Sequence, residues 1–414
     1  CLYLNVWTET MDSDAKRPVM FWIHGGGFTR GTGATDAYDG SALARKGVVV
    51  VTINYRLGVL GFMAHPELTA ESEHKASGNY AIMDMVAALE WVRDNIETFG
   101  GDPGNVTIFG ESAGSAAVSA LIGTPLAKGL FHRGIGQSGA ALGPMPQLQE
   151  TTDSNPSAES LGEVFQKSVG AESLAAMRSM SVDDLMTVAN QRSAPNFRIN
   201  VDGYVFPTSV MDAYRNGTHN DVPVMVGFNH DEMTAFIPEA MIPKTMEAFE
   251  TAGKQLYGDD WPALQKLYPV FEQPDIRTAV IRSRTHAGFG LSSFEWVEAT
   301  QKGESDAYLY YFTRLPRGED TPYGVYHAAE IMYAFNNVHV RPESYNDKDA
   351  EVADRISDYW VNFARTGNPN GDGLPAWPAY SSDERGYMEL GDEAVAGKRL
   401  LNEQLEFWSA RSGW

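Results

Sequence analysis

Gly110-Glu111-Ser112-Ala113-Gly114 is the stretch around which the chain is organised. The apolar residues 106–109 precede it and the small residues 115–120 follow it. This context predicts a strand, a sharp turn and a helix, which is the setting of a nucleophile elbow. The glycines let backbone segments approach closely or take a positive φ, and the helix N-terminus favours an oxyanion. Such a pattern arises by accident about 0.1–0.4 times in a chain this long, so other motifs must support it.

The composition is that of an acidic globular protein. Of the 414 residues, 43% are hydrophobic and 21% are charged, which allows a large core and disfavours disorder. A net charge of −22 excludes a protein built to hold a nucleic-acid backbone. Solubility is the main consequence of this charge, and attraction of cationic substrates is the alternative. Length alone indicates about two to three domains.

The N-terminus is unusual for a natural chain start. Cys1 is the single cysteine, so no disulfide can form within the chain. The sequence opens directly in an alternating strand at residues 2–7, without a preceding turn or Met. We interpret the natural N-terminal portion as missing, and any targeting signal with it, so the compartment is left open. No apolar run approaches the roughly 18 residues of a membrane-spanning helix, and we expect a monomer or homodimer.

Strands and helices alternate in the first part of the chain. Residues 19–23 and 48–54 are continuous apolar runs, typical of strands buried on both faces. Residues 77–99 carry apolar side chains at helical spacing, and the strand at 106–109 follows. This order predicts an α/β fold with a central, mostly parallel, twisted sheet and helices on both faces.

A glycine-rich loop follows the strand at 19–23. Its sequence is His24-Gly25-Gly26-Gly27-Phe28, so backbone N–H groups are left uncovered by side chains. In a serine hydrolase such a loop supplies an oxyanion donor. A phosphate-binding loop is the alternative, but no Gly-Lys-Ser/Thr follows and no helix begins there.

The second part of the chain is richer in helices. Residues 144–220 and 241–305 are predicted to be mainly helical insertions over the active site, forming a lid or pocket wall. Strands are predicted at 222–227 and 307–312, and a short one at 135–138 that ends in Ser138. Further helices are expected at 347–366 and 400–410.

A serine hydroxyl becomes a nucleophile only when a base takes its proton and an acid orients that base. In doubly wound hydrolases the chain order is Ser, then Asp or Glu, then His, each after a strand. Asp231 and Glu232 follow the strand at 222–227, and His327 follows the strand at 307–312. The order therefore allows either carboxylate to serve with Ser112 and His327.

The chain resembles the type-B carboxylesterase/cholinesterase family of α/β-hydrolases. The motifs that carry this resemblance run in family order across nearly the whole chain: residues 1–7, 24–28, 54–56, 109–114, 227–232 and 326–330. The resemblance implies Ser112 as nucleophile, Glu232 rather than Asp231 as acid, and His327 as base. It also implies one catalytic domain over residues 1–414 that lacks the N-terminal part of the family fold.

The same resemblance assigns the supporting residues. It implies oxyanion donors at the backbone N–H groups of Gly26, Gly27 and Ala113, and a buried supporting role for Glu111. We add His24 as support for the glycine loop and Ser138 as a further supporting candidate. Substrate-pocket candidates are aromatic, although each is also a plausible core residue: Phe28, Phe236, Phe289 and Phe335.

Departures from the family pattern and expected absences complete the prediction. Met233 stands where family members usually carry glycine, which would reshape the acid loop. Cys1 lacks the upstream cysteine with which the family often pairs it, and the aromatic residue that binds choline would lie in the missing portion. The other histidines show no metal-ligand spacing, so no metal site and no cofactor are inferred.

The predicted function is hydrolysis of small to medium carboxylic esters, above all short-chain ones, through a Ser-His-Glu triad and an acyl-enzyme. One alternative is the same triad acting on an amide, a thioester, or a polymeric or aromatic ester. The alternative from another class is a non-catalytic, cholinesterase-like adhesion protein. The only partner implied is a small-molecule ester, with no nucleic acid and no membrane span.

Overall fold

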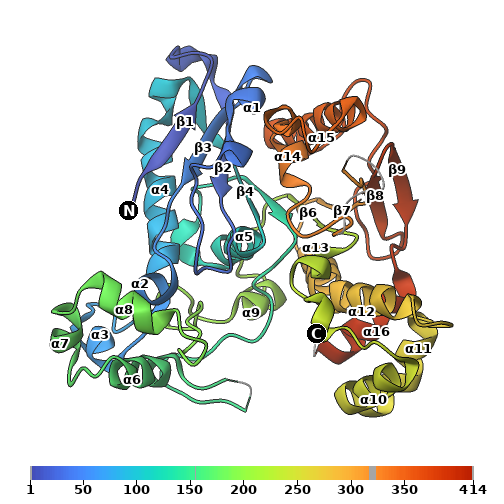
Figure 1. Cartoon of the computed structure of the whole chain (residues 1–414). Helices are drawn as coiled ribbons and strands as arrows, with labels where there is room; N and C mark the ends of the chain where they lie inside the picture. Colours follow the sequence, from blue (N-terminus) through green and yellow to red (C-terminus); the bar gives the residue numbers. More distant parts are fainter. Residues whose placement is uncertain (1, 154, 317–322, 413–414) are drawn as a thin grey trace. The chain divides into compact units, whose positions relative to one another are not determined.

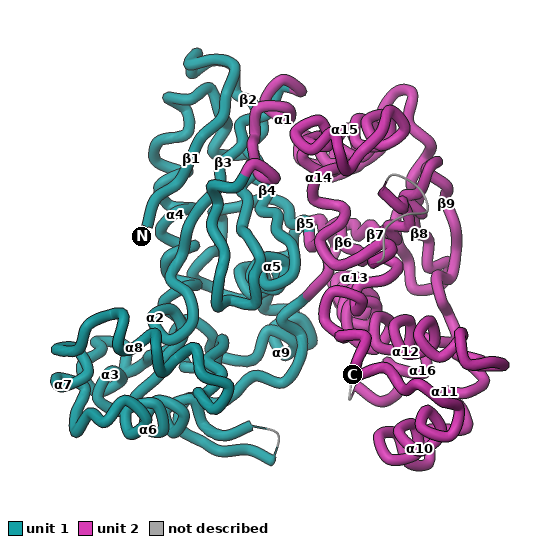
Figure 2. Tube along the Cα trace, in the orientation of Figure 1, with its two compact units in different colours: residues 1–35, 47–135, 140–222 teal, residues 36–46, 136–139, 223–414 magenta. Residues whose placement is uncertain are grey.

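The computed structural model describes residues 2–153, 155–316 and 323–412. Cys1, and the question of its pairing, lies outside these residues. The chain forms two compact units, each assembled from separated stretches (Figure 2). Unit 1 holds residues 1–35, 47–135 and 140–222, and unit 2 holds residues 36–46, 136–139 and 223–414. Neither unit is contiguous in sequence, so one catalytic domain over 1–414 stays a prediction. Among the described helices, none has the length and apolar character needed to cross a membrane.

The strands of unit 1 are mostly parallel (Figure 1). β2 (Arg17–Ile23) lies between β3 (Val49–Ile53) and β4 (Gly101–Glu111) and is parallel to both, while β1 (Leu4–Trp7) is antiparallel to β3. Residues 19–23 of β2 and all of β3 are buried, as expected for runs of apolar residues in strands covered on both faces.

The helices of unit 1 follow the predicted order. The long predicted helix at 77–99 is observed as α4 (Tyr80–Asn95) with a 3-10 turn at Ile96–Phe99, and it stops at Gly100, whose φ is 73°. Serine side chains cap α6, α7 and α8, which explains their sharp starts. The remaining helices of the unit are α2 (Gly58–Phe62), α3 (Pro66–Glu71), α5 (Ala113–Gly123), α6 (Ala158–Ser168), α7 (Leu174–Arg178), α8 (Val182–Ala189) and α9 (Val210–Arg215).

β5 (Arg133–Gln137) begins in unit 1 and ends in unit 2. In unit 2, β6 (Val224–Asn229) is parallel to β7 (Ala307–Phe312), which is parallel to β8 (Gly386–Leu390). β9 (Ala394–Lys398) closes the edge by antiparallel pairing with β8. The sequence predicted β7 with its correct bounds but missed β8 and β9. Their short length, their glycines and the mostly exposed residues of β9 give no apolar run to detect.

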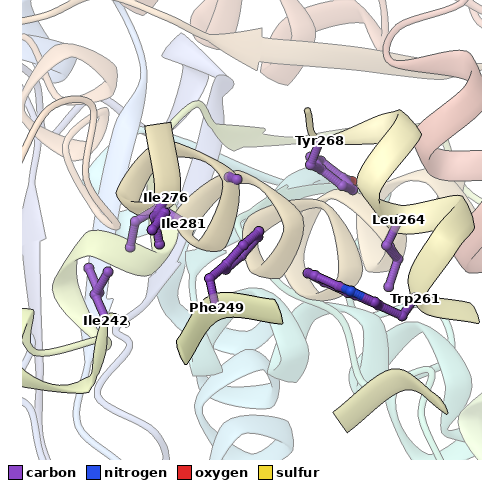
Figure 3. Close-up of a cluster of buried hydrophobic side chains, with 8 residues drawn as sticks. Ile242, Phe249, Trp261, Leu264, Tyr268, Ile276 and Ile281 are labelled. Atoms are coloured by element: carbon purple, nitrogen blue, oxygen red, sulfur yellow. The ribbon is translucent and has the colours of Figure 1, made fainter. Parts of the chain in front are cut away.

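Unit 2 contains a helical region with a core of its own. A cluster of buried hydrophobic side chains forms this core, and most of them come from α10 (Met246–Tyr257), α11 (Trp261–Leu267) and α12 (Asp275–Thr285) (Figure 3). In the cluster, the rings of Phe249 and Trp261 pack edge-to-face with centroids 5.0 Å apart. A single π-helical turn at His286–Gly290 joins α12 to α13 (Leu291–Thr300). These helices account for most of residues 241–305. That this segment and residues 144–220 are insertions over an active site stays a prediction.

An early segment of the chain belongs to unit 2. Residues 36–46 carry α1 (Ser41–Arg45) and contact α15 (Asp347–Thr366) through Lys46, whose Nζ lies 2.7 Å from Asp354 and 2.6 Å from Asp358. Asn337, after α14 (Ile331–Ala334), donates to the carbonyl of Asp39 at 2.8 Å. The C-terminal helix α16 (Asn402–Ser412) completes the unit.

Candidate active site

The predicted elbow has the expected strand-turn-helix form. β4 ends at Glu111, α5 begins at Ala113, and Ser112 stands between them with φ 59° and ψ −119°. This backbone conformation costs a residue with a side chain of order 1–3 kcal/mol and is typical of active sites. The Gly-x-Ser-x-Gly pattern allowed a positive φ at the flanking glycines, but the positive φ is at Ser112 itself.

The two elbow glycines are explained by close packing. A Cβ on Gly110 would lie 2.6 Å from the carbonyl oxygen of Ile23, and a Cβ on Gly114 would overlap that same oxygen. Ile23 is the last residue of β2. The glycines therefore let the elbow lie directly against the end of the neighbouring strand, which fixes the position of Ser112.

The glycine loop lies against the elbow. A Cβ on Gly25 would lie 2.7 Å from the Glu111 carbonyl oxygen and 3.1 Å from the Ser112 Cβ. Gly26 and Gly27 have φ of 106° and 63°, conformations that residues with a Cβ avoid. No hydrogen bond among the described residues uses the N–H of Gly26 or Gly27. Ala113 is the first residue of α5, where a backbone N–H has no partner within the helix.

Buried side chains contact this loop, and a supporting role for His24 and Glu111 stays a prediction. His24 is 1% exposed, its Nδ1 lies 2.8 Å from the Gly25 carbonyl, and its ring stacks on Tyr55. The Tyr55 hydroxyl donates to the His24 carbonyl at 2.7 Å. Burial lowers the pKa of His24, so the ring is neutral and donates from Nδ1 to the loop. Glu111 is 4% exposed, and its Oε2 packs against Gly25.

A hydrogen-bonded carboxylate–imidazole pair is present in unit 2. Glu232 follows β6, and its Oε2 lies 2.6 Å from His327 Nδ1. Its other oxygen accepts from the Asn229 backbone N–H at 2.7 Å, so the fully buried carboxylate uses both oxygens. A carboxylate partner places the proton on Nδ1 and leaves Nε2 of His327 as the basic nitrogen.

Asp231 has different partners, although it is adjacent to Glu232. One oxygen lies 2.8 Å from His230 Nδ1, and the other accepts from the Val325 backbone N–H at 3.0 Å. Burial by itself raises the pKa of Asp231, but the hydrogen bonds from His230 and the Val325 N–H and the nearby charge of Arg282 outweigh it and lower the pKa. Of the two carboxylates left open by chain order, Glu232 is hydrogen-bonded to His327, whereas Asp231 is hydrogen-bonded to His230 and Val325.

The four aromatic pocket candidates lie in three places. Phe236 and Phe289 flank His327, with ring centroids 4.8 Å and 4.6 Å from the imidazole. Phe28 packs in unit 1 against Phe62 at 5.0 Å. Phe335 is fully buried in unit 2, 5.9 Å from Tyr38, and is not among the rings that contact His327.

Ser138, the remaining supporting candidate, follows β5 with φ 58° and is fully buried. Its N–H donates to the Gly227 carbonyl at 2.8 Å, which ties it to β6. Within the described part of the chain its hydroxyl has no hydrogen-bond partner. A role in supporting the active site stays a prediction.

A buried hydrogen-bond network beside the base was missed by sequence reasoning. Glu330 is 1% exposed and accepts from Gln137 at 3.0 Å and from Asn229 at 2.5 Å. Trp360 donates to Gln137 at 3.1 Å. The one sequence signal was a glutamate three residues after His327. The partners of this glutamate come from distant parts of the chain.

Among residues 2–153, 155–316 and 323–412, no group of three or more His, Cys, Asp or Glu could hold a metal ion.

Comparisons with known proteins cover nearly the whole chain. The model of a family described as "Carboxylesterase family" matches residues 1–408. Fumonisin B1 esterase of Sphingopyxis macrogoltabida is 36% identical over 97% of this chain and 74% of its own. The medium-chain fatty acyl-CoA hydrolase precursor of Anas platyrhynchos is 34% identical over 99% of this chain and 75% of its own. The crystal structure of a Geobacillus stearothermophilus carboxylesterase matches with a TM-score of 0.85 and 30% identity, over 98% of this chain and 85% of that one. The expected α/β-hydrolase fold is thereby confirmed.

Proposed function

Because the chain belongs to the carboxylesterase family, we propose that it hydrolyses carboxylic esters with Ser112 as nucleophile, His327 as base and Glu232 as acid. Family membership makes the chain a serine carboxylic ester hydrolase, and the alternative of a non-catalytic adhesion protein is not retained. The observation that carries the residue assignment is the strained backbone of Ser112 at the start of α5. A fold keeps such strain where it serves a function.

The proposed reaction proceeds in two halves. His327 Nε2 takes the Ser112 proton as Oγ attacks the ester carbonyl, and Glu232 stabilises the resulting imidazolium. The oxyanion accepts hydrogen bonds from the N–H groups of Gly26, Gly27 and Ala113. When the tetrahedral intermediate collapses, His327 returns the proton to the leaving alcohol and an acyl-enzyme remains. Water then attacks the acyl-enzyme with the same proton transfers and releases the acid.

The proposed substrates are small to medium esters, above all short-chain ones. The rings of Phe236 and Phe289 next to His327 support an apolar substrate surface at the base. A thioester is the second candidate class, because a 34% identical relative is named a fatty acyl-CoA hydrolase. An oxyester and a thioester with the same acyl group, assayed in parallel, discriminate the two classes.

The test is hydrolysis of p-nitrophenyl esters of increasing acyl length by the wild type and by Ser112→Ala, with fluorophosphonate labelling of both. We expect wild-type turnover that declines with chain length, labelling at Ser112, and loss of both in the variant. Wild-type turnover by Ser112→Ala would refute the residue assignment. Activity that rises with chain length would leave the triad standing and overturn the short-chain proposal.

A further inference from the structure

The two loops that carry the acid and the base are joined by hydrogen bonds close to the reacting groups. The Asp231 backbone N–H donates to the Val325 carbonyl at 2.9 Å, and the Val325 N–H donates back to the Asp231 carboxylate at 3.0 Å. The Asn229 amide donates to the Tyr326 carbonyl at 2.9 Å, and the Thr234 hydroxyl lies 2.7 Å from the Tyr323 carbonyl. We call this set of bonds, between residues 229–234 and 323–326, the loop clamp.

Asp231 is the central residue of the loop clamp. Both its backbone N–H and its side chain are hydrogen-bonded to Val325, which lies two residues before His327. Its second carboxylate oxygen accepts from His230 Nδ1. Arg282 Nη2 lies 3.3 Å from the other ring nitrogen, Nε2, which must accept there because an arginine only donates. The arginine thus favours the His230 tautomer that donates to Asp231.

The base loop is shaped to receive this carboxylate. Gly324 has φ 62°, and a Cβ at this position would overlap Oδ2 of Asp231. A residue with a side chain would therefore separate Asp231 from the Val325 N–H in addition to straining the backbone. The lowered pKa of Asp231 keeps the carboxylate ionised, and so an acceptor for both donors, across the neutral range.

We propose that Asp231 is a positioning residue that holds the loop of His327 in register with Glu232, and thereby keeps the catalytic imidazole aligned. This proposal rests on the proposed function, because it gives Asp231 an effect only through the Glu232–His327 pair. Both loops follow neighbouring parallel strands, β6 and β7. Strand pairing sets where each loop begins but not the conformation of the loop beyond the strand. The clamp supplies that constraint within a few residues of the 2.6 Å contact. Misalignment of a catalytic group by about 1 Å can cost roughly 100-fold in rate.

The test is a double-mutant cycle with Asp231→Asn and Glu232→Gln. Asparagine keeps the volume of aspartate but leaves an N–H₂ group facing one of its two donors. We expect Asp231→Asn alone to lower kcat by about 10- to 100-fold with KM nearly unchanged. In the Glu232→Gln background the same substitution should cost less than about threefold, because the alignment it supports is already lost.

Substitutions at Gly324 and His230 keep the test decisive if Asp231→Asn is poorly folded. Gly324→Ala alters no charge and should also lower kcat with little change in KM. His230→Asn retains a donor near the Nδ1 position and should keep more activity than His230→Ala. Asp260→Asn, which removes an exposed ion pair with Arg411 in the same unit, is the matched control and should keep wild-type kcat. Rates are normalised to the fraction of enzyme labelled by fluorophosphonate.

The outcomes separate this proposal from the proposed function. Equal loss from Asp231→Asn in both backgrounds would indicate a general structural role and overturn the positioning role. Wild-type kcat in both Asp231→Asn and Gly324→Ala would also overturn it, while the triad would stand if Glu232→Gln still lowered kcat strongly. If Glu232→Gln itself had no effect, the proposed triad would fail first.

Discussion

The nucleophile side and the acid–base side of the proposed site are built by different physical means. In unit 1, Ser112 and the glycine loop are held by backbone packing, and Gly25, Gly110 and Gly114 are needed because no Cβ fits. In unit 2, Glu232 and His327 are held by hydrogen bonds between side chains and backbone, notably at Asp231. A glycine position where no Cβ fits tolerates no larger residue, whereas a set of several hydrogen bonds can lose one bond and keep the others. The predicted substitutions differ accordingly.

The largest effect is expected at the nucleophile. Ser112→Ala should lower kcat by on the order of 10³- to 10⁶-fold, because no other group can form the acyl-enzyme. Folding should be retained or improved, since alanine removes only a hydroxyl. The check is ester turnover with thermal unfolding of the same sample. Residual turnover that is still labelled by fluorophosphonate at another serine would point to a different nucleophile.

On the acid–base side, Glu232→Gln should lower kcat by about 10²- to 10⁴-fold, because glutamine no longer favours the His327 tautomer with a basic Nε2. Asp231→Asn is the natural comparison, since the two carboxylates are adjacent and both are hydrogen-bonded. Steady-state kinetics of both variants should give the larger loss at Glu232. The reverse order would assign Asp231 as the acid.

Gly25→Ala tests the backbone-packed side without touching a reacting group. Its Cβ would press on Glu111 and Ser112, so the oxyanion donors should be displaced and kcat should fall by about 10²- to 10³-fold. Gly288→Ala is a control in unit 2, where the added Cβ has open space. Equal kinetics for Gly25→Ala and wild type would contradict the tight packing.

Acid should weaken unit 2 through His286, which is 3% exposed and hydrogen-bonded to Tyr268 at 3.0 Å. Burial lowers the pKa of His286 to about 3 from the ordinary histidine value of 6.5. Between these pH values the unfolded chain binds a proton that the folded chain does not, so the unfolding free energy falls as pH falls. The slope from this group is at most about 1.4 kcal/mol per pH unit.

Denaturant unfolding at pH 4 to 7 checks this expectation. His286→Gln should flatten the dependence, while His339→Gln, at an exposed position, should leave it unchanged. Parallel curves for wild type and His286→Gln would show that His286 does not carry the acid sensitivity.

The smallest effects on activity are expected at the aromatic side chains. Phe236→Leu and Phe289→Leu should change kcat/KM by about 3- to 10-fold, since one apolar contact is worth about 1 kcal/mol. Phe335→Leu should affect stability more than kinetics, because its ring is fully buried away from the rings that contact His327. Kinetics and thermal unfolding of the three variants separate a substrate surface from a core position.

Sequence patterns predicted those parts of the molecule whose cause is local. The elbow, the glycine loop and β7 follow from apolar runs and glycines within a few residues, so their positions were found. Chain order placed an acid after β6 but could not choose between Asp231 and Glu232 without family resemblance. The loop clamp and the Glu330 network escaped detection because their partners are about 100 to 200 residues apart. Polar residues at such distances carry no periodicity from which contact could be inferred.

The early segment at residues 36–46 has a consequence for biosynthesis. Its Lys46 pairs with Asp354, which is 308 residues later in the chain. At roughly 5–20 residues per second, a ribosome needs roughly 15–60 s to make that partner after Lys46. Unit 2 therefore cannot complete its fold while the first half of the protein is emerging, and the nascent chain carries exposed apolar surface throughout that interval. This topology therefore affects the yield of folded protein during synthesis rather than the catalytic rate.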